Sequence, residues 1–141
     1  MAPIHILLIE DNEGDILLTT EALEEGKIAN KISVVTDGKQ AIDFLGKQGK
    51  FANVDTPHLV LLDINLPKKN GHEVLHFIKS EDSIKHLPVI MLTTSSLEKD
   101  IIESYKNYAN CYITKPVEVK DFMNAIAKIK TFWFTIVQLP S

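Results

Sequence analysis

The sequence contains no arginine: all 15 of its basic residues are lysine. Proteins that read DNA bases depend on arginine for paired hydrogen bonds with guanine, so we do not expect a nucleic-acid partner. Cysteine is almost as scarce, and a single residue, Cys111, excludes both an internal disulfide and a zinc site built from cysteines.

Long apolar runs are also missing, since none approaches the ~20 residues that cross a bilayer. The start of the chain, Met1 to Pro3, has no basic region and no cleavage site of a secretory signal. We therefore expect a cytoplasmic protein without a membrane partner. With 141 residues, 45% of them hydrophobic, and a net charge of -4, the chain fits one globular domain over residues 1–141 and not a disordered protein.

Short apolar runs alternate with helical patterns along the chain. The predicted strands are Ile4 to Ile9, Ile32 to Thr36, Leu59 to Leu62, Val89 to Leu92 and Cys111 to Thr114. The predicted helices are Asp15 to Gly26, Lys39 to Gly46, Gly71 to Ser80, Glu98 to Tyr108 and a last one from Glu118 onward, and Lys47 to Pro57 is predicted as a surface loop. Five alternations of strand and helix predict a doubly wound α/β fold with a parallel sheet.

Chemically active residues follow the predicted strands, where open α/β sheets bind their ligands. Glu10 and Asp11 follow the first strand, Asp63 follows the third, Thr93 follows the fourth and Lys115 follows the fifth. Each of these has an ordinary explanation taken singly, because acids and hydroxyls cap helices and lysines occupy solvated turns. Their occurrence together at one edge of one sheet favours a functional site.

The three acids should converge within a few Å of one another. Two carboxylates about 4 Å apart repel by roughly 4 kcal/mol at an effective dielectric of 20, so the cluster favours a bound cation. Because all the ligands are oxygens, Mg²⁺ is the cation that we expect. A carboxylate beside that ion can act as a nucleophile toward phosphorus, with Lys115 and the Thr93 hydroxyl contacting the phosphoryl oxygens.

The ordered set of motifs resembles the receiver domain of two-component response regulators. The segments that carry the resemblance are IHILLIEDNEGD, LVLLDINLPKKNG, PVIMLTTSS and NCYITKP, which together span nearly the whole chain. The resemblance implies a flavodoxin-like fold, in which five parallel strands in the order 2-1-3-4-5 are flanked by five helices.

The resemblance also implies residue roles at the metal and phosphoryl site. Asp63 matches the phosphoacceptor, and Glu10 and Asp11 match the acidic pair. Asp11 and Asp63 would bind Mg²⁺ directly, and Glu10 would act mainly through water. Asn65 matches the residue whose backbone carbonyl is a further metal ligand.

A second group of matches concerns signal output. Thr93 matches the switch hydroxyl, Lys115 the phosphate-binding lysine and Tyr112 the aromatic side chain that changes rotamer. Pro67 and Gly71 match the turn that closes the loop after the phosphoacceptor. The implied function is that of a single-domain response regulator, with no catalysis beyond its own phosphorylation and dephosphorylation.

The implied partner is a sensor histidine kinase or a phosphotransfer protein. The NCYITKP segment and a tail that contains Phe-Trp and, near its end, Leu-Pro are most similar to the regulators of bacterial phytochrome kinases.

Other functions remain open as alternatives. An aspartate-nucleophile phosphohydrolase of the haloacid-dehalogenase type needs a second aspartate two positions after the nucleophile, where this chain has Asn65. An adaptor with the receiver fold that is never phosphorylated would be expected to lack Asp63, Lys115 or the acidic pair, and all are present. A Rossmann nucleotide site would need clustered glycines after the first strand, and only Gly14 is there.

The tail, residues 132–141, forms an apolar extension. Three aromatic residues are consecutive from Phe132 to Phe134, and a last helix already has an apolar stripe of its own. An exposed patch of this kind usually meets a partner, so we expect a homodimer whose interface includes Phe132, Trp133, Phe134 and Ile136. The alternative is a tail that folds back over its own domain.

Overall fold

The computed structural model describes residues 4–25, 30–64, 66–93 and 111–114. Its elements are β1 (Ile4–Ile9), α1 (Glu13–Glu25), β2 (Asn30–Val35), α2 (Gly38–Leu45), a 3₁₀ turn (Gly49–Phe51), β3 (Leu59–Asp63), α3 (Gly71–Ser80), β4 (Val89–Thr93) and β5 (Cys111–Thr114). All neighbouring strands pair in parallel, in the order β2-β1-β3-β4-β5. The predicted doubly wound sheet and its strand order are confirmed.

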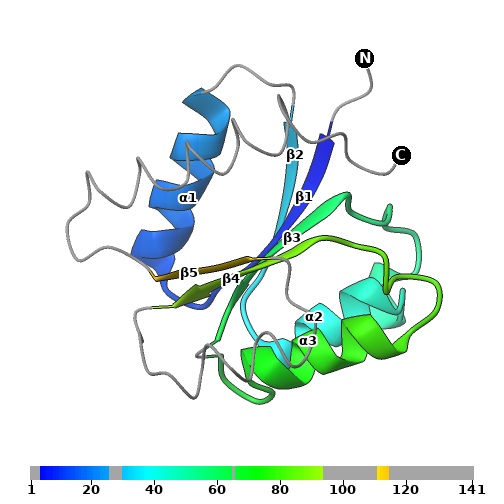
Figure 1. Ribbon diagram of the computed structural model, residues 1–141. Coiled ribbons are helices and arrows are strands. Elements are labelled where there is room, and N and C mark those ends of the chain that lie inside the picture. Colours follow the sequence, from blue (N-terminus) through cyan, green and yellow to red (C-terminus); the bar gives the residue numbers. More distant parts are fainter. Residues whose placement is uncertain (1–3, 26–29, 65, 94–110, 115–141) are drawn as a thin grey trace.

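Helices cover both faces of the sheet. In Figure 1, α1 lies on one face and α2 and α3 lie together on the other. Two apolar cores correspond to these faces. The larger one contains Leu7, Phe44 and Val74, and the smaller one contains Ile6, Leu8 and Leu23.

The inner strands are buried on both sides, as their unbroken apolar runs predict. Ile6 to Ile9 of β1 and Val60 to Leu62 of β3 have no exposed surface. Every residue of β3 through Asp63 is buried. The polar groups that follow these strands are therefore attached to fully buried strands in the middle of the sheet.

Several predicted boundaries were wrong by one to two residues. β2 begins at Asn30 and not at Ile32, because Asn30 and Lys31 pair in register with Ile4 and His5 of β1 despite their polar side chains. α1 begins at Glu13, since the side chain of Asn12 accepts a hydrogen bond from the backbone N–H of Asp15 at 2.9 Å.

The connection predicted as a surface loop, Lys47 to Pro57, contains one 3₁₀ turn. Phe51 of this turn packs on Phe44 of α2, with 5.3 Å between the ring centroids. The loop therefore adds to the core next to α2.

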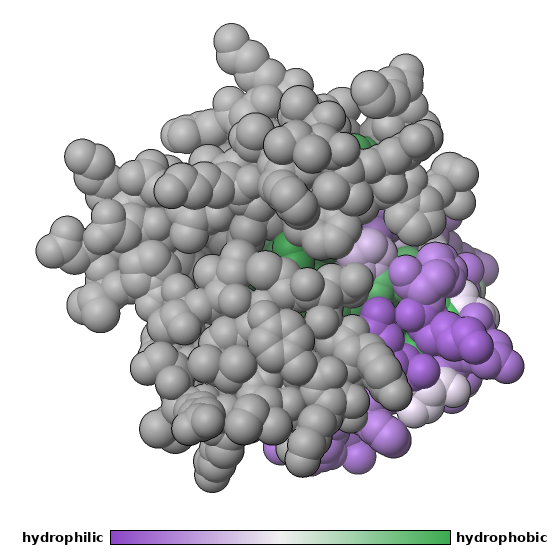
Figure 2. All heavy atoms as spheres, in the orientation of Figure 1, coloured by the Kyte–Doolittle hydropathy of each residue, from purple (hydrophilic) through white to green (hydrophobic). Residues whose placement is uncertain are grey.

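The predicted helices at Glu98 to Tyr108 and from Glu118 onward, and the apolar tail at 132–141, lie outside the described residues. No helix in the described part of the chain is both long enough and apolar enough to span a membrane. On the face drawn in Figure 2, the surface of the coloured residues is mainly hydrophilic, and hydrophobic residues show only in small gaps between other atoms.

Candidate functional site

The carboxyl ends of β1 and β3 bring three carboxylates together. Ile9 pairs in register with Leu62, so Glu10 and Asp63 follow at neighbouring positions on the same edge of the sheet. One carboxylate oxygen from each of Glu10, Asp11 and Asp63 lies within 4.8 Å of the other two. The predicted convergence of the three acids is confirmed.

The three acids differ in exposure. Glu10 is 1% exposed and Asp63 is 6% exposed, whereas Asp11 is open to solvent. Oε2 of Glu10 accepts hydrogen bonds from the backbone N–H groups of Asp11 at 3.1 Å and Asn12 at 3.3 Å. These two donors fix the Glu10 carboxylate at the edge of the cluster, beside the solvent-exposed Asp11.

Electrostatic repulsion within this cluster favours a bound cation. At separations of up to 4.8 Å and an effective dielectric of 20, each pair of carboxylates repels by at least about 3.5 kcal/mol. A hard divalent cation removes that repulsion and prefers oxygen ligands. The donor set and its partial access to solvent through Asp11 fit such an ion.

Gly71 determines how closely α3 approaches the end of β3. Its N–H donates to the carbonyl oxygen of Ile64 at 2.8 Å. A Cβ atom at this position would collide with the carbonyl oxygen of Asp63 and would lie 2.6 Å from Cα of Ile64. Only glycine allows this contact, so the predicted turn residue also fixes the backbone of Asp63.

The other predicted site residues are described in part. Thr93 ends β4 and pairs with Thr114, and Tyr112 of β5 pairs with Met91; for Thr93 and Tyr112 the structure describes the backbone. Asn65 and Lys115 lie outside the described residues.

Two further acids near β1 belong to α1 and not to the cluster. Glu13 and Asp15 lie in the first turn of that helix. Carboxylates at this position interact favourably with the partial positive charge of the helix N-terminus. The ordinary explanation, helix capping and dipole stabilisation, therefore accounts for these two residues.

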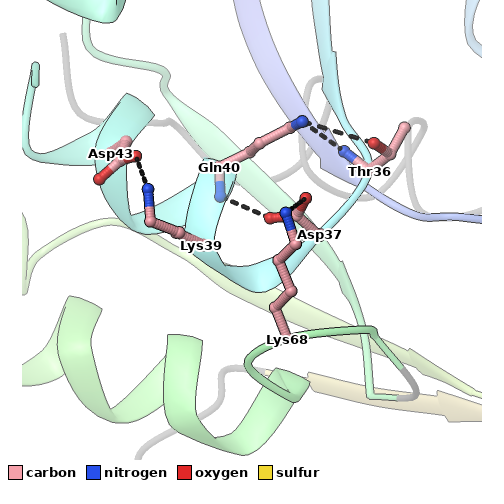
Figure 3. Close-up of polar contacts among 6 residues, drawn as sticks. All are labelled: Thr36, Asp37, Lys39, Gln40, Asp43 and Lys68. Atoms are coloured by element: carbon pink, nitrogen blue, oxygen red, sulfur yellow. Dashed lines mark hydrogen bonds and ion pairs between the residues drawn. The ribbon is translucent and has the colours of Figure 1, made fainter. Parts of the chain in front are cut away.

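Sequence reasoning missed the contact between the start of α2 and the loop after Asp63. Asp37 is the N-cap of α2, and its Oδ1 accepts a hydrogen bond from the N–H of Gln40 at 2.7 Å. Its Oδ2 also lies 3.7 Å from Nζ of Lys68 in the β3–α3 loop, as Figure 3 shows. The sequence feature that could have indicated this contact is the Asp37-Gly38 pair shortly after β2. Its partner Lys68, however, lies about thirty positions further along the chain.

Residues 6–127 match the family described as response regulator receiver domain. Response regulator Rcp1 from Synechocystis sp. (strain ATCC 27184 / PCC 6803 / Kazusa) is 43% identical over 139 residues, which are 99% of this chain and 95% of the relative.

Two solved structures are similar over the same length. The phosphorylated cyanobacterial phytochrome response regulator RcpA has a TM-score of 0.97 and 43% identity, covering 99% of this chain and 100% of that chain. The Mn²⁺-bound form of Rcp1 has a TM-score of 0.95, with the same identity and coverage. Receiver domains thus bind a divalent metal ion, in agreement with the cluster of three acids.

The fold, the acidic cluster and the match over residues 6–127 lead to one assignment. The chain belongs to the response regulator receiver domain family, whose members act as phosphoacceptors in signalling.

Proposed function

We propose that Asp63 is the phosphoacceptor and that a sensor histidine kinase or a phosphotransfer protein supplies the phosphoryl group. The observation that carries this proposal is the position of Asp63, which is buried at the end of β3 and within 4.8 Å of two other carboxylates. In the transfer, a carboxylate oxygen of Asp63 attacks phosphorus and the bond between phosphorus and the imidazole nitrogen breaks. The products are an acyl phosphate on Asp63 and a free imidazole.

Mg²⁺ is the cation that we assign to the cluster. Asp11 and Asp63 would bind it directly, Glu10 would act mainly through water, and Asn65 would contribute its backbone carbonyl. When bound, the ion supplies positive charge to the carboxylates and to the transferred phosphoryl group. The exposed Asp11 leaves this side of the site open to the incoming phosphodonor.

Thr93, Lys115 and Tyr112 are the residues that we assign to signal output. The phosphoryl group adds about -1.5 to -2 charges. The Thr93 hydroxyl and the Lys115 ammonium contact that charge, and Tyr112 then turns inward and changes the surface next to β5. Thr93 and Tyr112 lie on the paired strands β4 and β5, which supports a coupled movement.

The similarity to RcpA and Rcp1 supports a phytochrome-type kinase as the partner.

We further propose that the chain is a single cytoplasmic receiver domain and that its chemistry is limited to its own phosphorylation and dephosphorylation. We also propose that it forms a homodimer whose interface contains Phe132, Trp133, Phe134 and Ile136.

Phosphorylation by a small phosphodonor tests the proposal. Incubation with phosphoramidate and Mg²⁺ should add one phosphoryl group to the wild type, measured by intact-protein mass spectrometry, and none to Asp63→Asn. The matched control is Asp82→Asn, which removes an exposed acid after α3 and should be labelled normally.

Persistent labelling of Asp63→Asn on another carboxylate would contradict the assignment. Absence of labelling in the wild type would favour the unphosphorylated adaptor. Steady release of phosphate from a phosphomonoester would favour the phosphohydrolase.

A further inference from the structure

The connection between β2 and α2 lies against the loop that follows Asp63. The N–H of Gly38 donates to the carbonyl oxygen of Pro67 at 3.3 Å. A Cβ atom at Gly38 would collide with the carbonyl oxygen of Lys69 and would lie 2.6 Å from its carbonyl carbon. Because these are backbone atoms, the loop cannot keep its position if residue 38 has a side chain.

Polar contacts support the same arrangement. Figure 3 shows Lys68 extending from the loop toward Asp37, the N-cap of α2, with 3.7 Å between Nζ and Oδ2. Lys68 has a φ of 67°, a left-handed backbone conformation that residues other than glycine rarely adopt. The surrounding contacts therefore hold this loop in a conformation that it does not prefer by itself.

The other end of this loop is fixed on Asp63. Gly71 packs against the carbonyl of Asp63, and the N–H of Leu66 donates to the carbonyl oxygen of Ile64 at 3.2 Å. The backbone that follows the candidate phosphoacceptor is therefore held at Gly71 on one side and at Gly38 on the other.

The end of β2, just before this connection, contacts the backbone at Glu10, the first residue of the acidic cluster. The N–H of Glu10 donates to the carbonyl oxygen of Val35 at 3.1 Å, just before Thr36 and Asp37. Thr36 in turn donates through its N–H to Oε1 of Gln40 at 3.1 Å, which ties the connection to the first turn of α2. The end of β2 and the connection that follows it thus contact both parts of the backbone that present the acidic cluster.

We propose that Gly38, together with the Asp37–Lys68 pair, is a positioning site for the metal and phosphoryl chemistry at Asp63. It holds the β3–α3 loop, and with it the backbone of Asp63, in the place where the carboxylates share a cation. This inference rests on the proposed function. Its consequence is that Mg²⁺ affinity depends on a residue that contributes no ligand.

The two parts of this site should differ in importance. The Lys68 side chain is 65% exposed, and ion pairs in that setting contribute little because water screens them. The contact at Gly38 involves buried backbone, and small displacements of reacting groups have large effects on transfer rates. We therefore expect substitution of Gly38 to weaken Mg²⁺ binding most, substitution of Asp37 to weaken it less, and substitution of Lys68 to weaken it least.

Mg²⁺ titration of single variants tests this ranking. Isothermal titration calorimetry should give a Kd about tenfold higher than wild type for Gly38→Ala, about threefold higher for Asp37→Ala, and within twofold for Asp37→Asn, which keeps the cap, and for Lys68→Met. The matched control is Gly46→Ala, at the other end of α2, where a new Cβ would lie 3.1 Å from the nearest atom and meet no part of the loop.

Labelling with phosphoramidate over a range of Mg²⁺ concentrations separates positioning from general loss of stability. For Gly38→Ala, the initial rate should fall most at low Mg²⁺ and recover in part at saturating Mg²⁺, whereas Gly46→Ala should follow the wild-type curve. Gly38→Ala with a folded circular-dichroism spectrum and a wild-type Kd would overturn the inference.

If Gly38→Ala does not fold, the Kd of Asp37→Ala for Mg²⁺ tests the positioning site in its place. A wild-type Kd for Asp37→Ala would then reject the positioning site. A wild type that binds Mg²⁺ but is never labelled refutes the proposed function, while the Mg²⁺ titrations still test the positioning site.

Discussion

At the scale of single residues, Glu10 is a buried acid whose carboxylate lies close to those of Asp11 and Asp63. Glu10→Gln keeps the oxygen that accepts hydrogen bonds from the N–H groups of Asp11 and Asn12 and removes the charge. We expect Mg²⁺ to bind about tenfold more weakly, so that saturating Mg²⁺ stabilises the variant by about 1.4 kcal/mol less than the wild type.

Urea denaturation with and without Mg²⁺ measures this difference. Glu13→Gln is the control, because Glu13 is exposed in the first turn of α1 and lies outside the acidic cluster. Equal stabilisation of the wild type and Glu10→Gln by Mg²⁺ would show that Glu10 has no part in metal binding.

At the scale of elements, α3 packs on the core through its own buried residues, which recur at helical spacing along one face. Leu75 has no exposed surface, while His76 beside it faces solvent. Leu75→Ala should lower the free energy of unfolding by about 2–5 kcal/mol, because the apolar contacts are lost and a cavity remains. His76→Ala should change it by less than about 0.5 kcal/mol. Equilibrium urea unfolding followed by circular dichroism compares the two, and similar midpoints would contradict this packing.

The elements also show what the sequence could predict. Apolar runs placed β1, β3 and β4 to within a residue, and those of β3 and β4 are unbroken because inner strands of a parallel sheet are buried on both faces. The same runs placed Glu10 and Asp63 at the edge where they meet.

The contact of Gly38 with the β3–α3 loop could not be predicted, because it depends on how two connections approach each other in space. The start of β2 was missed for a similar reason, because Asn30 and Lys31 join the sheet through backbone pairing with β1, which their residue types do not indicate.

At the scale of the whole molecule, one buried histidine links stability to pH. His5 is 3% exposed, and its Nε2 lies 2.8 Å from Oγ of Ser33. Burial first, and then the positive charge of Lys31, lower the pKa of His5 from its usual 6.5. The unfolded chain therefore binds more protons below about pH 6.5, so this contribution to stability is complete above that pH and is lost as the pH falls toward the folded-state pKa.

His5→Phe should accordingly flatten the fall in unfolding free energy between about pH 7 and pH 5. The measurement is urea denaturation at a series of pH values, with His76→Gln as the control that keeps the wild-type slope. An unchanged slope in His5→Phe would assign the pH dependence to other groups.

Assembly is the other property of the whole molecule. Truncation after Lys130 removes the proposed interface at Phe132, Trp133, Phe134 and Ile136 and should yield a monomer in analytical ultracentrifugation. The full chain should sediment as a dimer. A full chain that stays monomeric at high concentration, phosphorylated or not, would contradict the homodimer and favour a tail that folds back over its own domain.

The strand order has a consequence for synthesis on the ribosome. β1 is an inner strand, and one of its two neighbours, β3, is encoded about fifty residues later. At about 5–20 residues per second, roughly 3 to 11 s separate the translation of Ile9 from that of Asp63. During that interval the segment Ile6 to Ile9, which has no exposed surface in the folded chain, lacks its β3 neighbour and leaves apolar surface uncovered. The pairing that brings Glu10 beside Asp63 thus also sets the earliest moment at which the growing chain can fold.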